Sequence, residues 1–225
     1  MGVNRDNEFA VLFCTHKRGA GLAIFRMDGE SVRDEARKAM SRLATFASNQ
    51  PQQANLPHTS ASTFYFRDDK SATLFATCAG LTAENLGELY KFSLQSLDVE
   101  ESHVGIAGVV IGPGSFTGLR LGCAYVNGLA LGRRRVLWAV EGVSPEKVLQ
   151  KCRSMLPIEA DDFCGRTSTE LDDPFAVPTS FGDLLAHLEN WAVGAATEVS
   201  ILEPVYGRDP TPVIKLRQKQ GESQA

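Results

Sequence analysis

The 225-residue sequence predicts an α/β fold in which the later strands are parallel and covered by helices. Two observations support this class. Short apolar runs alternate along the chain with segments whose apolar residues recur at helical spacing. One of these runs, residues 106–111, leads through a glycine-rich turn directly into a helical segment, which indicates a buried strand followed by a covering helix.

The first sixty residues predict a pair of strands, a helix and a loop. Residues 9–13 and 22–25 are apolar runs separated by a polar turn, so we expect two strands. Residues 31–47 are expected to form a helix, because Ser31 can cap it and apolar side chains recur on one face. Residues 48–61 are polar and contain two prolines, so we expect a loop there.

A β-hairpin and an amphipathic helix follow. Residues 62–66 and 72–77 are rich in strand-forming residues and flank a charged turn. Residues 82–97 have the clearest amphipathic pattern of the first half, with Thr82 as the expected cap and leucines along one face. These elements precede the strand at residues 106–111.

The second half continues with helices and strands, and its pattern weakens after about residue 156. We expect a helix at 117–132, a strand at 136–140, a helix opening at Ser144, a helix at about 181–194 and a short strand at 199–202. Residues 157–180 contain prolines and acids with little periodicity, so no element is assigned to them.

Composition and charge argue against several classes of function. The formal net charge is −4, which disfavours direct binding to nucleic acid, because phosphate contacts need clustered lysine and arginine. Histidines and cysteines lack metal-ligand spacing, and no run approaches the roughly 18 apolar residues of a membrane span. The cysteines are scattered and odd in number, as in a reduced protein: Cys14, Cys78, Cys123, Cys152 and Cys164. We therefore expect a cytoplasmic protein with no metal site and no membrane segment.

The turn Gly112-Pro113-Gly114 is the first candidate functional site. Its proline fixes one φ angle, and its glycines can take backbone angles that other residues avoid. Ser115 or Thr117 can cap the following helix, and N–H groups at a helix start can bind an anion. The candidate residues for an anion or a nucleotide are Gly112, Gly114, Ser115, Thr117 and Arg120, the last as a counter-charge.

Three known loop motifs do not fit this turn. A phosphate-binding Walker A loop needs a lysine that is missing here, and the dinucleotide-binding pattern fails because Gly118 comes one position late. A nucleophile elbow needs glycine two residues after Ser115, where Thr117 stands. We therefore assign no catalytic residue.

The helix after the turn carries small residues at regular spacing. Gly118 and Gly122 are four residues apart, as are Gly128 and Gly132, which leaves a nearly bare backbone strip on a helix face. Each glycine inside a helix costs about 1 kcal/mol relative to alanine, so the spacing indicates that close packing is needed there. The strip can pack against the adjacent sheet or against a partner, and both interpretations stay open.

The sequence GPGSFTGLRLG, residues 112–122, resembles the hallmark of the TsaB (YeaZ) family, bacterial proteins needed to make threonylcarbamoyladenosine in tRNA. The GLAL segment at 128–131 fits the same pattern. Weaker similarity is found at residues 82–86 and in the segment PVYGR at 204–208, which resembles the family's C-terminal signature. The main resemblance covers roughly residues 72–150.

This resemblance implies an actin-like (ASKHA, RNase H-like) fold with two related lobes. Residues 1–156 would form the first lobe, and residues 157–225 a reduced second lobe with the C-terminal segment. Residues 31–70 look like an insertion, or like a first lobe rearranged relative to the family. Cys14 stands where family members have an aspartate in a phosphate-loop remnant, so a carboxylate that could organise a metal–nucleotide complex is missing.

The resemblance also implies a role as a non-catalytic partner subunit. TsaB-like proteins are similar to the transferase subunit TsaD and act by pairing with it, with a TsaE-like ATPase in the same set, and often form a homodimer when TsaD is absent. The chain would then contact tRNA only indirectly. It would need no cofactor beyond ATP or ADP at an interface shared with the partner. It would also lack protease activity, although older names of the family refer to a glycoprotease. Pairing runs through the helices equivalent to 82–97 and 117–132, and the interface residues implied are Glu84, Leu86, Leu89, Tyr90, Gly118, Gly122 and Tyr125. The alternative function is an ASKHA-type nucleotide-binding ATPase or kinase-like protein, with Gly112–Gly118 as the phosphate cradle.

Overall fold

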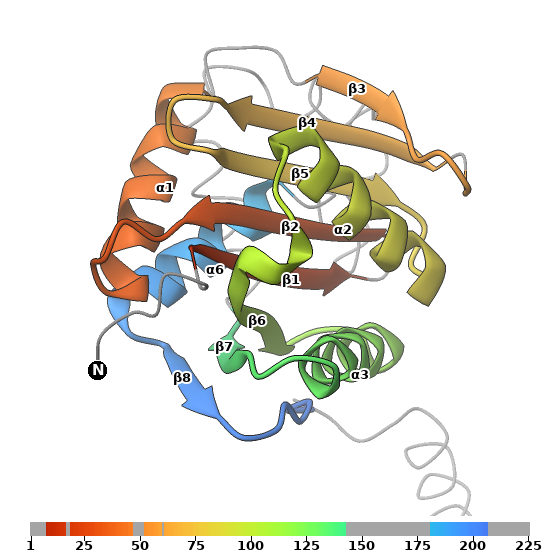
Figure 1. The fold of residues 1–225 in the computed structure, drawn as a ribbon. Helices are drawn as coiled ribbons and strands as arrows, with labels where there is room; N and C mark the ends of the chain where they lie inside the picture. Colours follow the sequence, from red (N-terminus) through yellow and green to blue (C-terminus); the bar gives the residue numbers. More distant parts are fainter. Residues whose placement is uncertain (1–7, 17–18, 47–51, 60, 143–180, 207–225) are drawn as a thin grey trace, which may run out of the picture.

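A computed structural model of the chain contains one mixed eight-stranded sheet with helices on both faces (Figure 1). The structure describes residues 8–16, 19–46, 52–59, 61–142 and 181–206. The strand order across the sheet is β3-β4-β5-β2-β1-β6-β7-β8. The predicted α/β class is therefore confirmed.

One half of the sheet is antiparallel. The first strand β1 (Phe9–His16) pairs with β2 (Gly19–Arg26), and β4 (Ser62–Asp68) pairs with β5 (Thr73–Ala79), which confirms both predicted strand pairs. β2 then pairs antiparallel with β5, so the two hairpins lie side by side. Each strand is longer than predicted, because polar or small residues at its ends still pair with a neighbouring strand.

The predicted loop at residues 48–61 is partly wrong. It contains a strand, β3 (Gln52–Asn55), which pairs antiparallel with β4 at the edge of the sheet. Its side chains are mostly exposed and polar, so no apolar periodicity marks it in the sequence. An edge strand of this kind is held by backbone hydrogen bonds along one side.

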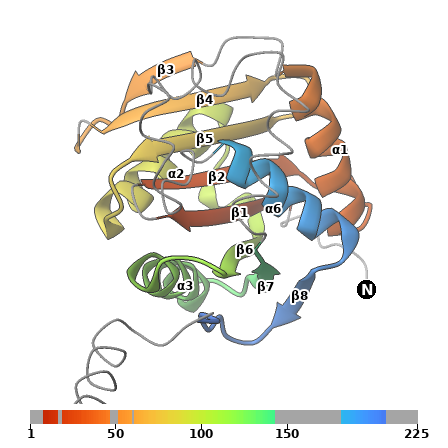
Figure 2. The ribbon, with the colours of Figure 1, turned by 180° about the vertical axis from the view of Figure 1, so that it is seen from behind.

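The four described α-helices cover the two faces in pairs, and a short 3-10 helix (Glu101–His103) precedes β6. Figure 1 shows α2 (Ala83–Leu97) and α3 (Phe116–Leu131) over one face, and Figure 2 shows α6 (Phe181–Val193) over the other, near α1 (Val32–Phe46). Strand β1 supplies both cores by the two-residue alternation of a strand. One core, beneath α1 and α6, contains Ala10, Leu12 and Cys14, and the other, beneath α2 and α3, contains Phe9, Val11 and Phe13.

The other half of the sheet is largely parallel. β6 (Val104–Gly112) pairs parallel with β1 and with β7 (Val136–Glu141), as the alternation of strands and helices predicts. The last strand, β8 (Ala196–Val199), pairs antiparallel with β7. The predicted strand at 199–202 is therefore misplaced, because the backbone of Leu202 bonds to a side chain of α3 instead of to a strand.

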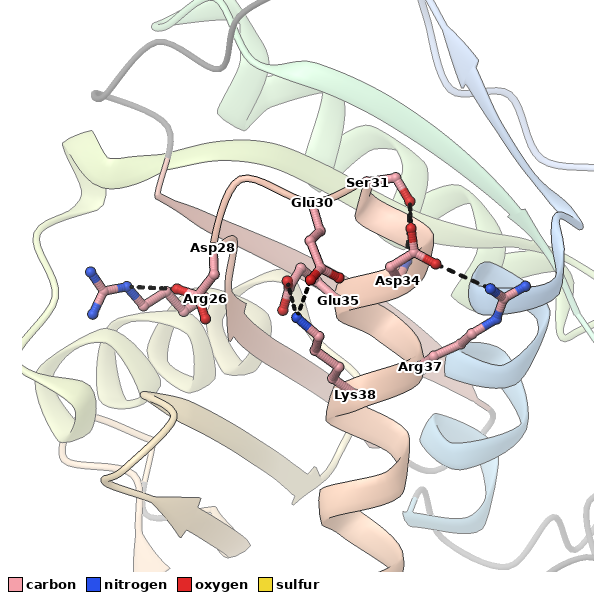
Figure 3. A network of polar contacts seen from close by, with 8 residues as sticks. All are labelled: Arg26, Asp28, Glu30, Ser31, Asp34, Glu35, Arg37 and Lys38. Carbon is pink, nitrogen blue, oxygen red and sulfur yellow. Dashed lines mark hydrogen bonds and ion pairs between the residues drawn. The ribbon is translucent and has the colours of Figure 1, made fainter.

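The start of α1 is organised by polar side chains (Figure 3). The Ser31 hydroxyl accepts a hydrogen bond from the Asp34 backbone N–H at 3.2 Å, which confirms the predicted cap. The Lys38 ammonium lies 2.8 Å from a carboxylate oxygen of Glu30 and 3.0 Å from one of Glu35, which is buried. These hydrogen bonds, first that to Glu30, raise the pKa of Lys38. The ammonium thus neutralises a carboxylate that the fold buries.

Residues 181–199 belong to the same sheet and core as residues 9–142. α6 packs on α1 and on the sheet, and β8 forms an edge strand. The range predicted as an insertion supplies α1, β3 and β4. The division into lobes at residue 156 stays a prediction, and the helix predicted to open at Ser144 lies outside the described residues.

The described cysteines are buried and form no disulfide within the described residues: Cys14, Cys78 and Cys123. Burial raises the pKa of Cys78 and of Cys123 to about 11, so both stay protonated at neutral pH. Cys152 and Cys164 lie outside the described residues. In the part of the chain that is described, no helix is long and apolar enough to span a bilayer.

Candidate functional site

The glycine turn connects β6 to α3, and Ser115 caps the helix. The Ser115 Oγ accepts a hydrogen bond from the Gly118 backbone N–H at 3.0 Å. Of the two hydroxyls that could cap α3, Ser115 is therefore the one that does so, while Thr117 is exposed. This capping hydrogen bond uses the Ser115 hydroxyl and the Gly118 N–H, two groups that an anion bound at the turn would otherwise contact.

The beginning of the turn is packed against two distant segments. The Gly142 N–H donates to the Gly112 carbonyl, and the Val205 N–H donates to the Ile111 carbonyl at 2.7 Å. A Cβ placed on Gly112 would overlap the carbonyl oxygen of Val205. Glycine is therefore required at 112 for close approach of the chain's own backbone, and that approach covers the turn on this side.

The other residues predicted to bind an anion lie around this packed turn. Gly114 and Arg120 are exposed. The Arg120 guanidinium lies 5.3 Å from the centre of the Phe116 ring, and that ring stacks on Tyr206 with centroids 4.4 Å apart. Arg120 thus takes part in an aromatic stack, and a role for it at an anion stays a prediction.

The segment that covers the turn is residues 200–206, named here the strap. Leu202 is held at both backbone groups by Asn127 of α3, whose amide donates to the Leu202 carbonyl and accepts from its N–H, each at 2.9 Å. At its other end, Tyr206 stacks on Phe116. The strap therefore runs alongside α3 in the opposite direction, from the level of Asn127 to that of Phe116.

Replacement of Asn127 by alanine is expected to loosen the strap while the rest of the fold stays intact. The change removes both side-chain hydrogen bonds to Leu202, which should lower the free energy of local opening by about 1–2 kcal/mol. Amide hydrogen exchange measures this: the Leu202 and Val205 amides should exchange faster than in the wild type, while those of β1 stay protected. Equal acceleration in β1 would contradict a local role for Asn127.

The residues predicted to contact a partner are divided between core and surface. Three of them, Leu86, Leu89 and Tyr90, lie on the face of α2 that is buried against the sheet. The centre of the Tyr90 ring lies 5.6 Å from that of the Phe13 ring. These side chains fill the protein's own core because the leucine-rich face of α2 is the face that covers the sheet. Their place at an interface stays a prediction, and the exposed residues of α2 are others, among them Glu84.

Glu84 and Tyr125 are the predicted interface residues that keep exposed surface. Glu84 is exposed in the first turn of α2, and Tyr125 is half-buried on α3, where its hydroxyl approaches Gly87 of α2. Burial raises the pKa of Tyr125 to about 12, and the nearby Glu101 carboxylate adds to the effect. Tyr125 thus occupies the seam between the two helices as a neutral phenol.

The predicted glycine strip of α3 has two different environments. A Cβ on Gly122 would lie 3.1 Å from side-chain carbons of Thr15 and Val109, and the Thr15 hydroxyl donates to the Gly118 carbonyl at 2.7 Å. Gly118 and Gly122 therefore allow α3 to pack closely on β1 and β6, as the interpretation of an internal contact predicts. Gly128 has nothing within 4 Å of its Cβ position and faces open space.

A buried arginine at the end of α3 is a structural residue that the sequence pattern only partly reveals. Arg135 donates to the backbone carbonyls of Leu129 at 2.8 Å and Val104 at 3.0 Å, and to the Glu101 carboxylate at 2.8 Å. Cations often follow a helix C-terminus, and this preference explains its position. It does not distinguish Arg135 from Arg134, which is exposed.

Comparisons with known proteins place the similarity in this part of the chain. Residues 76–144 match the model of the TsaD family, tRNA N6-adenosine threonylcarbamoyltransferase. This range contains α2, β6, the glycine turn, α3 and β7. A comparison with curated proteins gives no match.

Two solved structures also align with the chain. One is YeaZ from Pseudomonas aeruginosa, with 18% sequence identity and a TM-score of 0.41 over 65% of this chain and 49% of that one. The other is described as an uncharacterized protein with similarity to peptidase YEAZ from Pseudomonas aeruginosa, with 17% identity and a TM-score of 0.39 over 65% and 48%. The chain thus spans about half the length of both structures. Residues 112–122 predict a resemblance to TsaB (YeaZ) proteins, which are similar to TsaD. This prediction is confirmed over residues 76–144, where the chain is similar to the TsaD family.

Proposed function

We propose that the chain is a non-catalytic partner subunit of a TsaD-type transferase and that it works in threonylcarbamoyladenosine biosynthesis in tRNA. One observation carries this proposal: the similarity to the transferase family coincides with the unit formed by α2, the glycine turn and α3. In that unit, Gly118 and Gly122 serve internal packing, whereas Glu84, Tyr125 and the open side of α3 keep surface for a partner.

Three features of the turn and of the neighbouring end of β1 support a role without catalysis. The Ser115 oxygen accepts the capping hydrogen bond from the Gly118 N–H, which gives this hydroxyl a structural role. Cys14, where the resemblance implies an aspartate, is buried at the end of β1. Thr15 beside it donates to the Gly118 carbonyl, so its hydroxyl holds α3 on the sheet.

The same features favour a partner subunit over an ASKHA-type ATPase or kinase. A phosphate group would need to approach the backbone of the turn, and Val205 already packs on Gly112. The proposal includes four further expectations. ATP or ADP would bind at an interface shared with the transferase, and a TsaE-like ATPase would belong to the same assembly. The chain would contact tRNA only indirectly and would form a homodimer in the absence of the transferase.

Depletion of the protein tests the proposed function. Threonylcarbamoyladenosine in bulk tRNA, measured by mass spectrometry of nucleosides, should fall as the protein is depleted and recover when the wild-type chain is supplied again. The tagged chain should also co-purify with the organism's own TsaD-type transferase. A normal content of the modified nucleoside together with no co-purification would overturn the proposal, and ATP binding by the isolated chain with Mg²⁺ would favour the alternative.

A further inference from the structure

The strap, residues 200–206, is attached to the rest of the fold mainly through its backbone. It leads from β8 to α3, and none of its residues belongs to a helix or a strand (Figure 1). Leu202 is its one buried residue and joins the core beneath α2 and α3, whereas Pro204 is half-buried and the other five residues are exposed. A segment with a single buried apolar anchor opens at a lower free energy than the strands of a sheet.

Two attachments fix the strap by its backbone, one on α3 and one at the glycine turn. On α3, the Asn127 amide donates to the Leu202 carbonyl and accepts from the Leu202 N–H, each at 2.9 Å. At the turn, the Val205 N–H donates to the Ile111 carbonyl at 2.7 Å, and the Val205 carbonyl oxygen occupies the place where Gly112 would carry a Cβ. The strap thus covers the backbone of the turn and part of α3 at the same time.

The strap is a stiff link between these two attachments. Pro204 lies between them, and its ring fixes its own φ angle and restricts Glu203 before it to extended backbone. The surface to which the strap is attached is also stiff, because α3 is a continuous helix from Phe116, on which Tyr206 stacks, to Asn127, about 16 Å along its axis. Displacement of the strap at one attachment is therefore transmitted to the other.

We propose that the strap is a latch, which opens and closes as one unit while the sheet stays folded. Opening exposes the backbone of the glycine turn together with Asn127 and the apolar surface beneath Leu202. A molecule that binds either of these surfaces displaces the strap, so it also changes the affinity of the other surface for its own ligand. The latch is a property of the chain itself and does not rest on the proposed function.

Amide hydrogen exchange of the full chain, followed residue by residue by NMR, tests the latch. Asn127→Ala removes the acceptor of the Leu202 N–H, so the decisive amide in this variant is that of Val205, which bonds to Ile111. Gly112→Ala pushes Val205 away from the turn, so the decisive amide there is that of Leu202. Each decisive amide should exchange about tenfold faster than in the wild type, as the loss of one or two hydrogen bonds predicts.

Two further variants serve as the control and as a second test. Gly128→Ala is the matched control, because Gly128 is a glycine of α3 with open space around its Cβ position, so both strap amides should exchange at wild-type rates. Tyr206→Ala removes the stack on Phe116 from an exposed position, so it should leave the fold intact and still accelerate the Leu202 amide. Tyr206→Ala therefore decides the question if Gly112→Ala does not fold.

The pattern of exchange across the variants decides between a latch and independent local contacts. Acceleration confined to the amide nearest each substitution would overturn the latch. Equal acceleration of the β1 amides in Asn127→Ala or Tyr206→Ala would also overturn it, because the opening would then involve the whole sheet. Pro204→Gly removes the stiff link, so adding Asn127→Ala to it should no longer accelerate the Val205 amide. Transmission that persists in this double variant would overturn the role of Pro204.

Discussion

Replacement of Arg135 by alanine is expected to lower the free energy of unfolding by about 3 kcal/mol, because it leaves the buried Val104 carbonyl and the half-buried Leu129 carbonyl without their donor. The guanidinium bonds to the carbonyls of Leu129 and Val104 and to the Glu101 carboxylate, and the Arg135 side chain is only 2% exposed. It joins the C-terminal end of α3 to the N-terminal end of β6, the opposite ends from those that the glycine turn connects. Urea denaturation followed by circular dichroism measures the change.

The neighbouring arginine supplies the control for this experiment. Arg134→Ala removes the same charge from an exposed position, so its free energy of unfolding should stay within about 0.5 kcal/mol of the wild type. Similar losses in both variants would indicate that net charge, and not the buried hydrogen bonds, sets the effect. Arg135→Lys should recover little, because an ammonium cannot reproduce the fork of guanidinium donors.

Replacement of Gly122 by leucine is expected to destabilise the fold by about 3 kcal/mol and not to act selectively on a partner. Its Cβ alone would lie 3.1 Å from Thr15 and Val109, so the rest of a leucine side chain has no room between α3 and the sheet. The expected result is a lower denaturation midpoint in the isolated chain, with α3 displaced from β1. Denaturation without any partner present measures it.

Gly128→Leu is the matched control for this substitution. Gly128 lies on the same helix with open space around its Cβ position, so leucine should fit there and add about 0.7 kcal/mol of helix propensity. Any effect of Gly128→Leu on binding would then report on the surface of α3 and not on folding. Equal stability of the Gly122 and Gly128 variants would contradict the packing described for α3.

The sequence predicts those helices and strands whose local signals, the apolar spacing and the capping residues, all indicate the same element. α2 and α3 are recovered because apolar spacing, Thr82 and Ser115 all indicate the same helices. β3 is missed because an edge strand of polar residues is specified by the backbone of β4, which no local pattern reveals. The shift of the last strand has the same cause, since Asn127, distant in sequence, engages the backbone of Leu202.

The sequence predicts where the candidate site lies along the chain, but it does not predict which faces of α2 and α3 pack on the sheet and which stay exposed. Periodicity identifies the apolar face of α2, yet it cannot tell whether that face packs on the protein's own sheet or on another chain. In the structure, Leu86 and Leu89 are buried against the protein's own sheet, and the open surroundings of Gly128 distinguish it from Gly122. The strap could not be foreseen, because its contacts join the glycine turn to residues about ninety positions later in the chain.

The return of α6 to the sheet has a consequence for synthesis of the protein. Trp191 is completely buried, packs edge-on against Phe25 and lies so close to Gly108 that a side chain there would overlap its ring. A nascent chain that has emerged only to β7 therefore exposes the apolar face of β1 and β2 that α6 later covers. This face stays uncovered until residues 181–193 have been synthesised, so the growing polypeptide passes through a stage that is prone to aggregation and open to chaperones.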